Sequence, residues 1–188
     1  MSFDAAPETY GKQLDILRAL VPRARRVGVF WESTVAGADL YVAALDQAAR
    51  SVQIELRYYD MKTSDAFMLA FESMRADAAA GFVTIGGPVI QQWRKEIIDL
   101  AVKFRLPGVW HSRVMVDAGG LIAYGPKVSH FWLRAAEYTD RILRGTKPAD
   151  LPVQQPTEFD LVLNQRTAKA LGLAIPLLLM LQITEVIE

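Results

Sequence analysis

The sequence RRVGVFW at residues 25–31, followed by the turn ESTVAG at residues 32–37, predicts a buried strand that leads into a helix. A short apolar run bounded by basic residues and a polar turn is typical of a strand in the interior of a sheet. Residues 38–50 are rich in alanine and amphipathic at helical spacing, so a helix is expected there. A strand joined to a helix in this way is the building unit of parallel sheets.

The same alternation of strand and helix continues on both sides of this unit. Apolar residues at helical spacing over 8–20 predict a helix that ends at Pro22. Further strands are expected at 52–59, 81–85 and 106–110, and a further helix at 89–104. We therefore predict a three-layer α/β fold, in which a parallel sheet forms the middle layer and helices cover both of its faces.

The pattern changes after residue 110. It predicts a helix at 114–118, a strand at 121–124, a helix at 129–144 ending at Gly145, a proline-rich crossing at 147–156, a strand at 159–163 and a helix at 165–171. We expect residues 1–120 to form a parallel α/β lobe. Residues 121–188 are expected to form a crossing segment and a C-terminal strand-helix extension.

The composition excludes several classes of protein. The chain has 188 residues, 21 basic and 21 acidic residues, and no cysteine. A disulfide scaffold and a cysteine-based zinc site are therefore excluded. Because the net charge is zero, the sequence has no electrostatic footprint for nucleic acid, and we expect no nucleic-acid partner.

The sequence predicts neither a membrane helix nor a secretion signal. The N-terminus MSFDAAPETY lacks both a basic region and an apolar core, and no run of 18 apolar residues exists. The most apolar stretch, residues 171–183, is interrupted by Gly172, Pro176 and Gln182, so we expect it to pack as a tail. If Met1 is the natural start, the absence of a signal indicates a cytoplasmic location.

Candidate binding residues gather at the predicted carboxyl ends of the strands, where open α/β sheets hold ligands. These ends are Trp31 to Thr34, Asp60, Gly86 to Pro88, Trp110 to Ser112, and Tyr124 to Pro126. Ser33 and Thr34 suit a carboxylate, or alternatively cap a helix. Gly86 and Gly87 allow a close approach to a ligand, or alternatively form a tight turn. The aromatic residues Trp31, Trp110 and Tyr124 suit stacking on a flat ligand, or alternatively belong to the core.

The sequence offers little machinery for catalysis. The only histidines, His111 and His130, lie in different elements, and no HExxH, GxSxG or GxxxxGK[ST] pattern is present. The Gly86-Gly87 pair lacks the GxGxxG spacing of a dinucleotide site. We therefore expect no enzyme activity, no metal and no cofactor.

Two segments of the C-terminal half are similar to a known family. Residues 119–126 (GGLIAYGP) and residues 135–173, which include PADLPVQQPT, resemble ABC transporter substrate-binding proteins related to tryptophan- and tyrosine-uptake binding proteins. Residues 11–31 resemble the entry of that family into its second lobe. The resemblance covers roughly residues 11–175.

The resemblance implies a periplasmic-binding-protein-like (flavodoxin-like) lobe that binds without catalysing a reaction. Such proteins hold a small ligand, often an aromatic amino acid, in a cleft between two lobes and deliver it to an ABC permease from the periplasm. By position, the cleft face of this chain would be formed by Trp31, Glu32, Ser33, Thr34, Gly86, Gly87, Trp110, Ser112, Arg113 and Tyr124.

The chain as given lacks the leader and the first lobe that the resemblance implies. The crossing segment would then pack on a first lobe or on a partner chain, because its apolar face exceeds what monomers usually expose. We therefore expect a homo-oligomer, with a homodimer as the simplest form, through residues 121–173.

Two other functions compete with solute binding for transport. The chain could be a cytoplasmic ligand sensor or a protein-interaction module that reuses the same fold. It could also be an enzyme on a flavodoxin-like sheet, in which case turnover would depend on Asp60, His111 or Glu32, and fold alone cannot assign such an activity.

Overall fold

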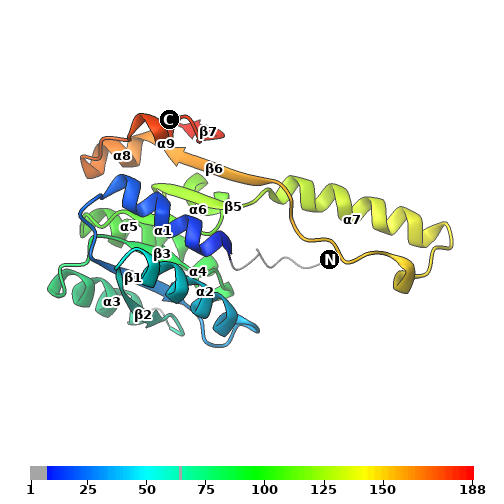
Figure 1. Cartoon of the computed structure of the whole chain (residues 1–188), viewed down its shortest axis with the longest axis horizontal. Helices are drawn as coiled ribbons and strands as arrows, with labels where there is room; N and C mark the ends of the chain where they lie inside the picture. The colour runs from blue at the N-terminus through cyan, green and yellow to red at the C-terminus, as the bar shows by residue number, and fades with distance from the viewer. Residues whose placement is uncertain (1–7, 64) are drawn as a thin grey trace.

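One mixed sheet organises the chain. The structure is a computed structural model and describes residues 8–63 and 65–188. Within these residues a seven-stranded sheet has the order β2-β1-β3-β4-β5-β6-β7 and carries helices on both faces (Figure 1). Its strands are β1 (Arg26–Trp31), β2 (Glu55–Asp60), β3 (Phe82–Thr84), β4 (Gly108–Trp110), β5 (Ile122–Pro126), β6 (Phe159–Asn164) and β7 (Glu185–Ile187). The predicted α/β fold is confirmed.

The helices follow the alternation that the sequence predicts. They are α1 (Glu8–Leu20), α2 (Ala38–Ser51), α3 (Asp65–Ala76), α4 (Pro88–Gln92), α5 (Arg94–Lys103), α6 (Arg113–Asp117), α7 (Val128–Leu143), η1 (Pro148–Asp150), α8 (Gln165–Leu171) and α9 (Leu177–Met180). The helix expected at 89–104 is divided in two at Trp93, which ends α4 and precedes α5.

Each face of the sheet has its own core, because side chains alternate along a strand. On β1, Val27 and Val29 pack with the residues of α1 and α2, while Phe30 points to the other face and packs with α3. Phe30 stacks on Phe82 with 4.8 Å between ring centroids. The apolar pattern of residues 25–31 therefore builds both cores at once.

The sheet is not parallel throughout, because its last two strands, β6 and β7, run opposite to the other five. Strands β1 to β5 pair in parallel, as predicted. Strand β6 pairs antiparallel with β5, and β7, which the sequence analysis did not predict, pairs in parallel with β6. Strand β2 starts at Glu55 rather than at Val52, because α2 reaches Ser51 and Gln53 takes a positive φ of 55°.

The sheet continues past residue 120, where we expected a boundary. Strands β5, β6 and β7 belong to the same sheet as β1, so the segment that leaves the lobe is shorter than residues 121–188. It comprises residues 127–158, here called the arm, and it projects from one end of the lobe (Figure 1). The backbone amide of Lys127 donates to the carbonyl of Glu158 at 3.0 Å and joins the two ends of the arm.

Helix α7 forms the outgoing half of the arm and has no buried residue. Its amphipathic pattern leaves one apolar stripe along the helix: Val128, Trp132, Ala135, Ala136, Thr139, Ile142 and Leu143. Gly145, which follows the helix, has a φ of 100°, as expected for a residue that ends a helix in the left-handed region.

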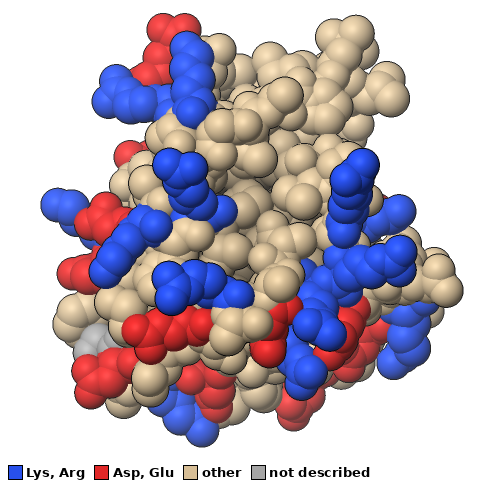
Figure 2. Space-filling model, turned by 90° about the vertical axis from the view of Figure 1, so that its left-hand side faces the viewer, with Lys and Arg blue, Asp and Glu red and all other residues tan. Residues whose placement is uncertain are grey.

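The surface carries charges of both signs. On the face shown in Figure 2, Lys and Arg side chains lie beside Asp and Glu side chains, which agrees with the zero net charge. Among the described residues, no helix has the length and apolar character needed to cross a bilayer.

Candidate functional site

The carboxyl ends of β1 to β5 lie along one edge of the sheet, because these strands are parallel. The first polar contact on this edge joins the turn after β1 to the end of β2. Ser33 donates from its backbone amide to Asp60 Oδ1 at 3.1 Å and from its hydroxyl to Asp60 Oδ2 at 2.7 Å. Helix α2 is capped instead by Gly37, so the interpretation of Ser33 as an N-cap is wrong.

Asp60 is ionised at neutral pH. Partial burial raises its pKa, but hydrogen bonds from Lys62 and Ser33 outweigh this effect and hold the pKa below its usual value. The Lys62 ammonium lies 2.8 Å from Asp60 Oδ2. The turn that contains Ser33 is therefore tied to a fixed negative charge.

Glu32 is a structural anchor rather than an exposed binding group. Its side chain is 1% exposed, and its Oε1 accepts a 2.7 Å hydrogen bond from the amide of Ile90 in α4. Among the described residues its Oε2 has no hydrogen-bond partner. A Cβ atom at Gly87 would lie 2.3 Å from the Glu32 carboxyl carbon, so glycine is required there to admit this carboxylate.

His111 occupies the middle of the edge, directly after β4. Its backbone amide donates to Thr84 Oγ1 at 3.0 Å, and its Nδ1 lies 3.0 Å from the same oxygen. The ring packs on Gly86, where a Cβ atom would lie 2.4 Å from the ring carbon Cδ2. Desolvation lowers the pKa of His111 to about 4, so the imidazole is neutral at pH 7. The two glycines of the predicted turn thus accommodate side chains of the protein itself.

Two of the three predicted stacking residues remain at the surface of the edge. Trp31 is partly exposed and lies edge-on to Tyr58, with 6.2 Å between ring centroids. Tyr124 is also partly exposed and stacks on Phe159 at 5.5 Å and 15°. Gln13 from α1 donates to the Tyr124 carbonyl at 3.2 Å and fixes the backbone there.

Trp110 does not lie at the surface, which corrects the expectation that it stacks on a ligand. It is 1% exposed and packs edge-on against Phe82 at 5.1 Å. The reason is the alternation along β4, which turns Val109 and Trp110 to opposite faces of the sheet and buries both. Trp110 therefore belongs to the core, where it packs beneath the end of the strand that precedes His111.

Ser112 and Arg113 begin helix α6. The Ser112 hydroxyl accepts from the amide of Val114 at 3.4 Å and caps the helix. The Arg113 guanidinium is turned to Glu185, with which it forms a bidentate ion pair, and it lies 3.4 Å from Asp117. Both residues thus have intramolecular roles, whereas Thr34 is exposed.

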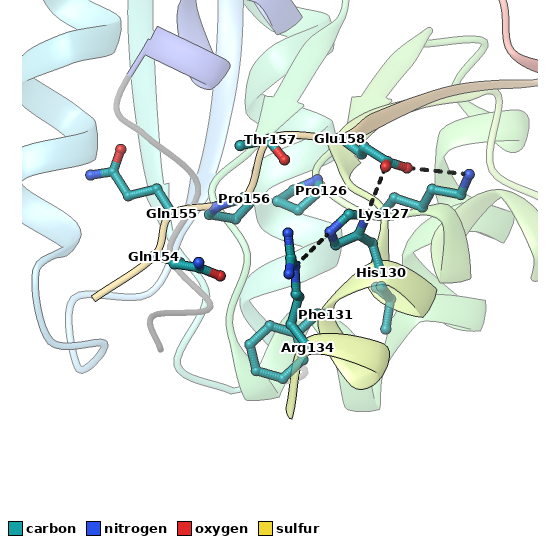
Figure 3. Close-up of a pocket in the computed structure, with 11 residues that line it drawn as sticks. Pro126, Lys127, His130, Phe131, Arg134, Gln154, Gln155, Pro156, Thr157 and Glu158 are labelled. Atoms are coloured by element: carbon teal, nitrogen blue, oxygen red, sulfur yellow. Dashed lines mark hydrogen bonds and ion pairs between the residues drawn. The ribbon is translucent and has the colours of Figure 1, made fainter. Parts of the chain in front are cut away.

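A separate cavity, here called the arm-base pocket, lies where the arm leaves the lobe (Figure 3). It has a volume of about 300 Å³. It is lined by Pro126, Lys127, Val128, His130, Phe131, Arg134, Gln154, Gln155, Pro156, Thr157 and Glu158. The sequence analysis missed it, because it arises only where residues 126–134 meet residues 154–158 in space.

The arm-base pocket is closed on one side by a polar chain of contacts. His130 Nδ1 lies 2.8 Å from Glu158, and Lys127 lies 3.6 Å from the same carboxylate. Arg134 donates from Nε to His130 Nε2 at 3.3 Å (Figure 3). The hydrogen bond from His130 lowers the pKa of Glu158. These contacts hold the first turns of α7 against the returning chain.

The side chains at this edge include hydroxyls, aromatic rings, two carboxylates and one histidine. Among residues 8–63 and 65–188, no group of three or more histidine and carboxylate residues could hold a metal ion. Thr84 was missed by the sequence analysis, although it is the one polar side chain in the apolar run GFVTI and that isolation was the available signal. The edge offers donors, aromatic rings and backbone, which suit binding.

Comparison with known proteins gives a consistent result. The family model for ABC transporter substrate binding protein matches residues 6–187. A tyrosine-binding protein from Clostridioides difficile (strain R20291) is 22% identical over 162 residues, which cover 86% of this chain and 47% of that protein. The chain thus spans about half the length of the curated relative that it matches.

Solved structures share the fold. A conserved domain protein from Vibrio cholerae has a TM-score of 0.86 at 21% identity, covering 95% of this chain and 60% of that one. The ABC domain in complex with L-Trp from Streptococcus pneumonia has a TM-score of 0.85 at 18% identity, with 95% and 62% covered. A ligand-free, open substrate binding protein with adhesive properties from Clostridium difficile has a TM-score of 0.70 at 20% identity, with 93% and 58% covered.

Proposed function

Because this chain belongs to the family of ABC transporter substrate binding proteins, we propose that it binds a small planar carboxylate, such as an aromatic amino acid, for uptake. The relatives that support this choice are described as a tyrosine-binding protein and as a complex with L-Trp. The observation that carries the proposal is the shared edge of β1 to β5. Exposed hydroxyls and partly exposed aromatic rings gather there without a metal cluster among the described residues.

The proposed ligand surface uses the strand-end residues in different ways. Trp31 and Tyr124 provide aromatic surface, while Thr34 and the Ser33–Asp60 pair provide polar groups. Gly86, Gly87 and Ser112 contribute backbone at the same edge. Glu32, Trp110 and Arg113 act through the residues that they hold in place. The ligand is held by contacts alone, and no bond is made or broken.

We further propose that the partners are an ABC permease on the periplasmic side and a second protein surface that covers the arm. The apolar stripe of α7 is long and exposed, with Leu143 at 81% and Ile142 at 40%. Such a stripe is stable only when packed, since most helix stability in proteins comes from burying an apolar face. We propose that self-association through residues 121–173 covers the stripe.

Ligand binding is tested by calorimetry and by intrinsic tryptophan fluorescence with L-tryptophan, L-tyrosine and, as a control, L-lysine. We expect saturable binding of the aromatic amino acids and about a tenfold weaker affinity after Trp31→Ala. Ser73→Ala on α3, which removes only a 3.4 Å contact with Tyr59, is a control that should bind as the unchanged chain does. The absence of binding to either aromatic amino acid would contradict the proposal.

A second candidate is a sensor or protein-interaction module. It is favoured by the arm, because an exposed amphipathic helix is a common surface for protein docking. The two functions differ in what the ligand controls. A permease whose transport depends on the chain supports uptake, whereas a ligand-dependent complex with a regulatory protein supports sensing.

A further inference from the structure

We propose that His111 is a ligand-binding residue, whose neutral imidazole donates a hydrogen bond from Nε2 to the carboxylate of the bound molecule. This inference rests on the proposed function and names one donor within it. The neighbours of His111 in the sequence have other roles, since Trp110 is buried and Ser112 caps α6.

Thr84 determines which ring nitrogen of His111 carries the proton. The Thr84 hydroxyl is 0% exposed, and its oxygen accepts from the backbone amide of His111 at 3.0 Å. Its own hydrogen needs an acceptor, and among the described residues the only one recorded within reach is His111 Nδ1, also at 3.0 Å. Donation from Thr84 to Nδ1 satisfies the hydroxyl completely. The opposite arrangement would leave a buried hydroxyl hydrogen without a partner.

The remaining nitrogen of the ring must then be a donor. When Nδ1 accepts, the proton of a neutral imidazole lies on Nε2. No partner for Nε2 is recorded among the described residues, and this atom is not among their buried unsatisfied polar atoms. His111 as a residue is partly exposed and directly follows the carboxyl end of β4. The Nε2–H group is therefore preset and available at the surface where the ligand is proposed to bind.

The surrounding backbone keeps this donor in place. The ring lies against Gly86, where a Cβ atom would come within 2.6 Å of Nε2. On the other side, Gly125 of β5 closely approaches the His111 carbonyl, since a Cβ there would lie 2.1 Å from that oxygen. The two glycines therefore confine both the ring and the backbone of His111. A preset donor loses little conformational freedom on binding, which favours affinity.

The chemistry of the donor identifies the group that it takes. In L-tryptophan the ammonium and the indole N–H are donors, so the carboxylate is the only strong acceptor. The low pKa of His111 keeps the ring uncharged, so it recognises the carboxylate as a neutral donor over the physiological pH range. Tryptamine, which has the same ring and ammonium but no carboxylate, lacks the acceptor and provides a matched probe.

The first experiment needs no ligand. Nitrogen-15 spectra of the histidine side chains at pH 7 should show His111 with its proton on Nε2 and with Nδ1 as an acceptor. Thr84→Val keeps the shape of the side chain and removes the hydroxyl, so the proton should redistribute between the two nitrogens. A proton found on Nδ1 in the unchanged chain would overturn the inference whatever the ligand is.

The second experiment measures binding of L-tryptophan and tryptamine to variants of the full chain. His111→Phe should weaken L-tryptophan binding about tenfold and leave tryptamine binding unchanged, whereas His111→Gln, whose amide reaches the position of Nε2, should recover most of the affinity. His130→Phe, which changes the other histidine, is the control. Thermal unfolding of each variant shows that it is folded.

The outcomes separate the inference from the function on which it rests. If the unchanged chain binds L-tryptophan and His111→Phe binds equally well, the inference is wrong and the proposed function stands. If the unchanged chain binds neither L-tryptophan nor L-tyrosine, the proposed function fails and the inference fails with it. Loss of binding in His130→Phe instead of His111→Phe would place the ligand in the arm-base pocket and overturn the inference.

Discussion

Glu32 and Ile90 lie 58 positions apart in the sequence, yet the Glu32 carboxylate accepts a 2.7 Å hydrogen bond from the Ile90 backbone amide. This bond crosses from the turn after β1 to the first turn of α4. It replaces the capping side chain that α4 lacks, since Gly87 occupies the N-cap position. A buried carboxylate therefore ties the turn after β1 to the start of α4 at this edge of the sheet.

Glu32→Gln and Glu32→Ala should differ clearly in stability. Glutamine keeps an oxygen that accepts from Ile90, so its unfolding free energy should stay within about 1 kcal/mol of the unchanged chain. Alanine leaves the buried amide without its acceptor and should cost about 1–3 kcal/mol. Chemical denaturation measures both. Equal stability of the two variants would show that the bond to Ile90 contributes nothing.

Gly87→Ala should destabilise the chain for a steric reason. The φ of Gly87 is −169°, which any residue adopts, so backbone strain is not involved. The added Cβ would lie within 2.6 Å of three carboxyl atoms of Glu32, and overpacking of this kind costs about 1–3 kcal/mol. In the double variant Gly87→Ala/Glu32→Ala, the loss of unfolding free energy should be smaller than the sum of the two single losses, because the clash is relieved. A purely additive double variant would contradict this explanation.

The Arg113–Glu185 pair should make the attachment of β7 sensitive to acid. The hydrogen bond from Arg113 lowers the pKa of Glu185 in the folded state. A group with a lowered pKa stabilises the fold above its unfolded pKa, near 4.5, and this contribution is lost as the pH falls through the folded value. Protection of the amides of residues 185–187 against hydrogen exchange, corrected for intrinsic rates, should therefore decrease below about pH 4.5.

Glu185→Gln serves as the control for the acid effect. It removes the titrating group, so protection of β7 should be lower at pH 7 and should change less on acidification. Protection that falls with pH as steeply in this variant as in the unchanged chain would assign the effect to other carboxylates, such as Glu158, whose pKa is also lowered.

Two substitutions on α7 test self-association through the arm. Ile142 and Leu133 are nine residues apart and therefore lie about 180° apart around the helix, with Ile142 on the apolar stripe and Leu133 opposite to it. Sedimentation should show that Ile142→Glu dissociates the oligomer at micromolar concentration and that Leu133→Glu does not. A clean monomer for the unchanged chain would exclude an interface made by the arm.

The sequence predicts most of the fold because its signals are local. The apolar run Val27 to Trp31 and the helical spacing over residues 8–20 depend only on neighbouring residues, and both elements form where expected. Strand β7 is different, since Glu185–Ile187 is short and is recruited by β6 and by Arg113, which is 72 positions from Glu185. No local sequence pattern predicts that pairing.

The candidate site is predicted less well, because position along a strand does not reveal direction. Trp110 and His111 are adjacent at the end of β4, yet Trp110 is buried while His111 is partly exposed and contacts Gly86. From the sequence we chose the tryptophan for stacking and included the histidine only as part of the strand-end segment Trp110 to Ser112 and as a residue of the enzyme alternative. The contact between the Thr84 hydroxyl and His111 Nδ1 joins β3 to the turn after β4, residues 27 positions apart, and no local pattern predicts it.

The pairing of β5 with β6 has a mechanical consequence. The chain enters and leaves the arm through two strands that are hydrogen-bonded side by side, in register from Ile122 with Leu163 to Pro126 with Phe159. Their ladder of hydrogen bonds couples any rotation of one strand to the other. Helix α7 has 16 residues and is about 24 Å long, so a rotation of about 10° at the base carries its tip through about 4 Å. The base of the arm lies beside the Tyr124–Phe159 stack, so a small rotation there would become a larger displacement at the far end of the arm.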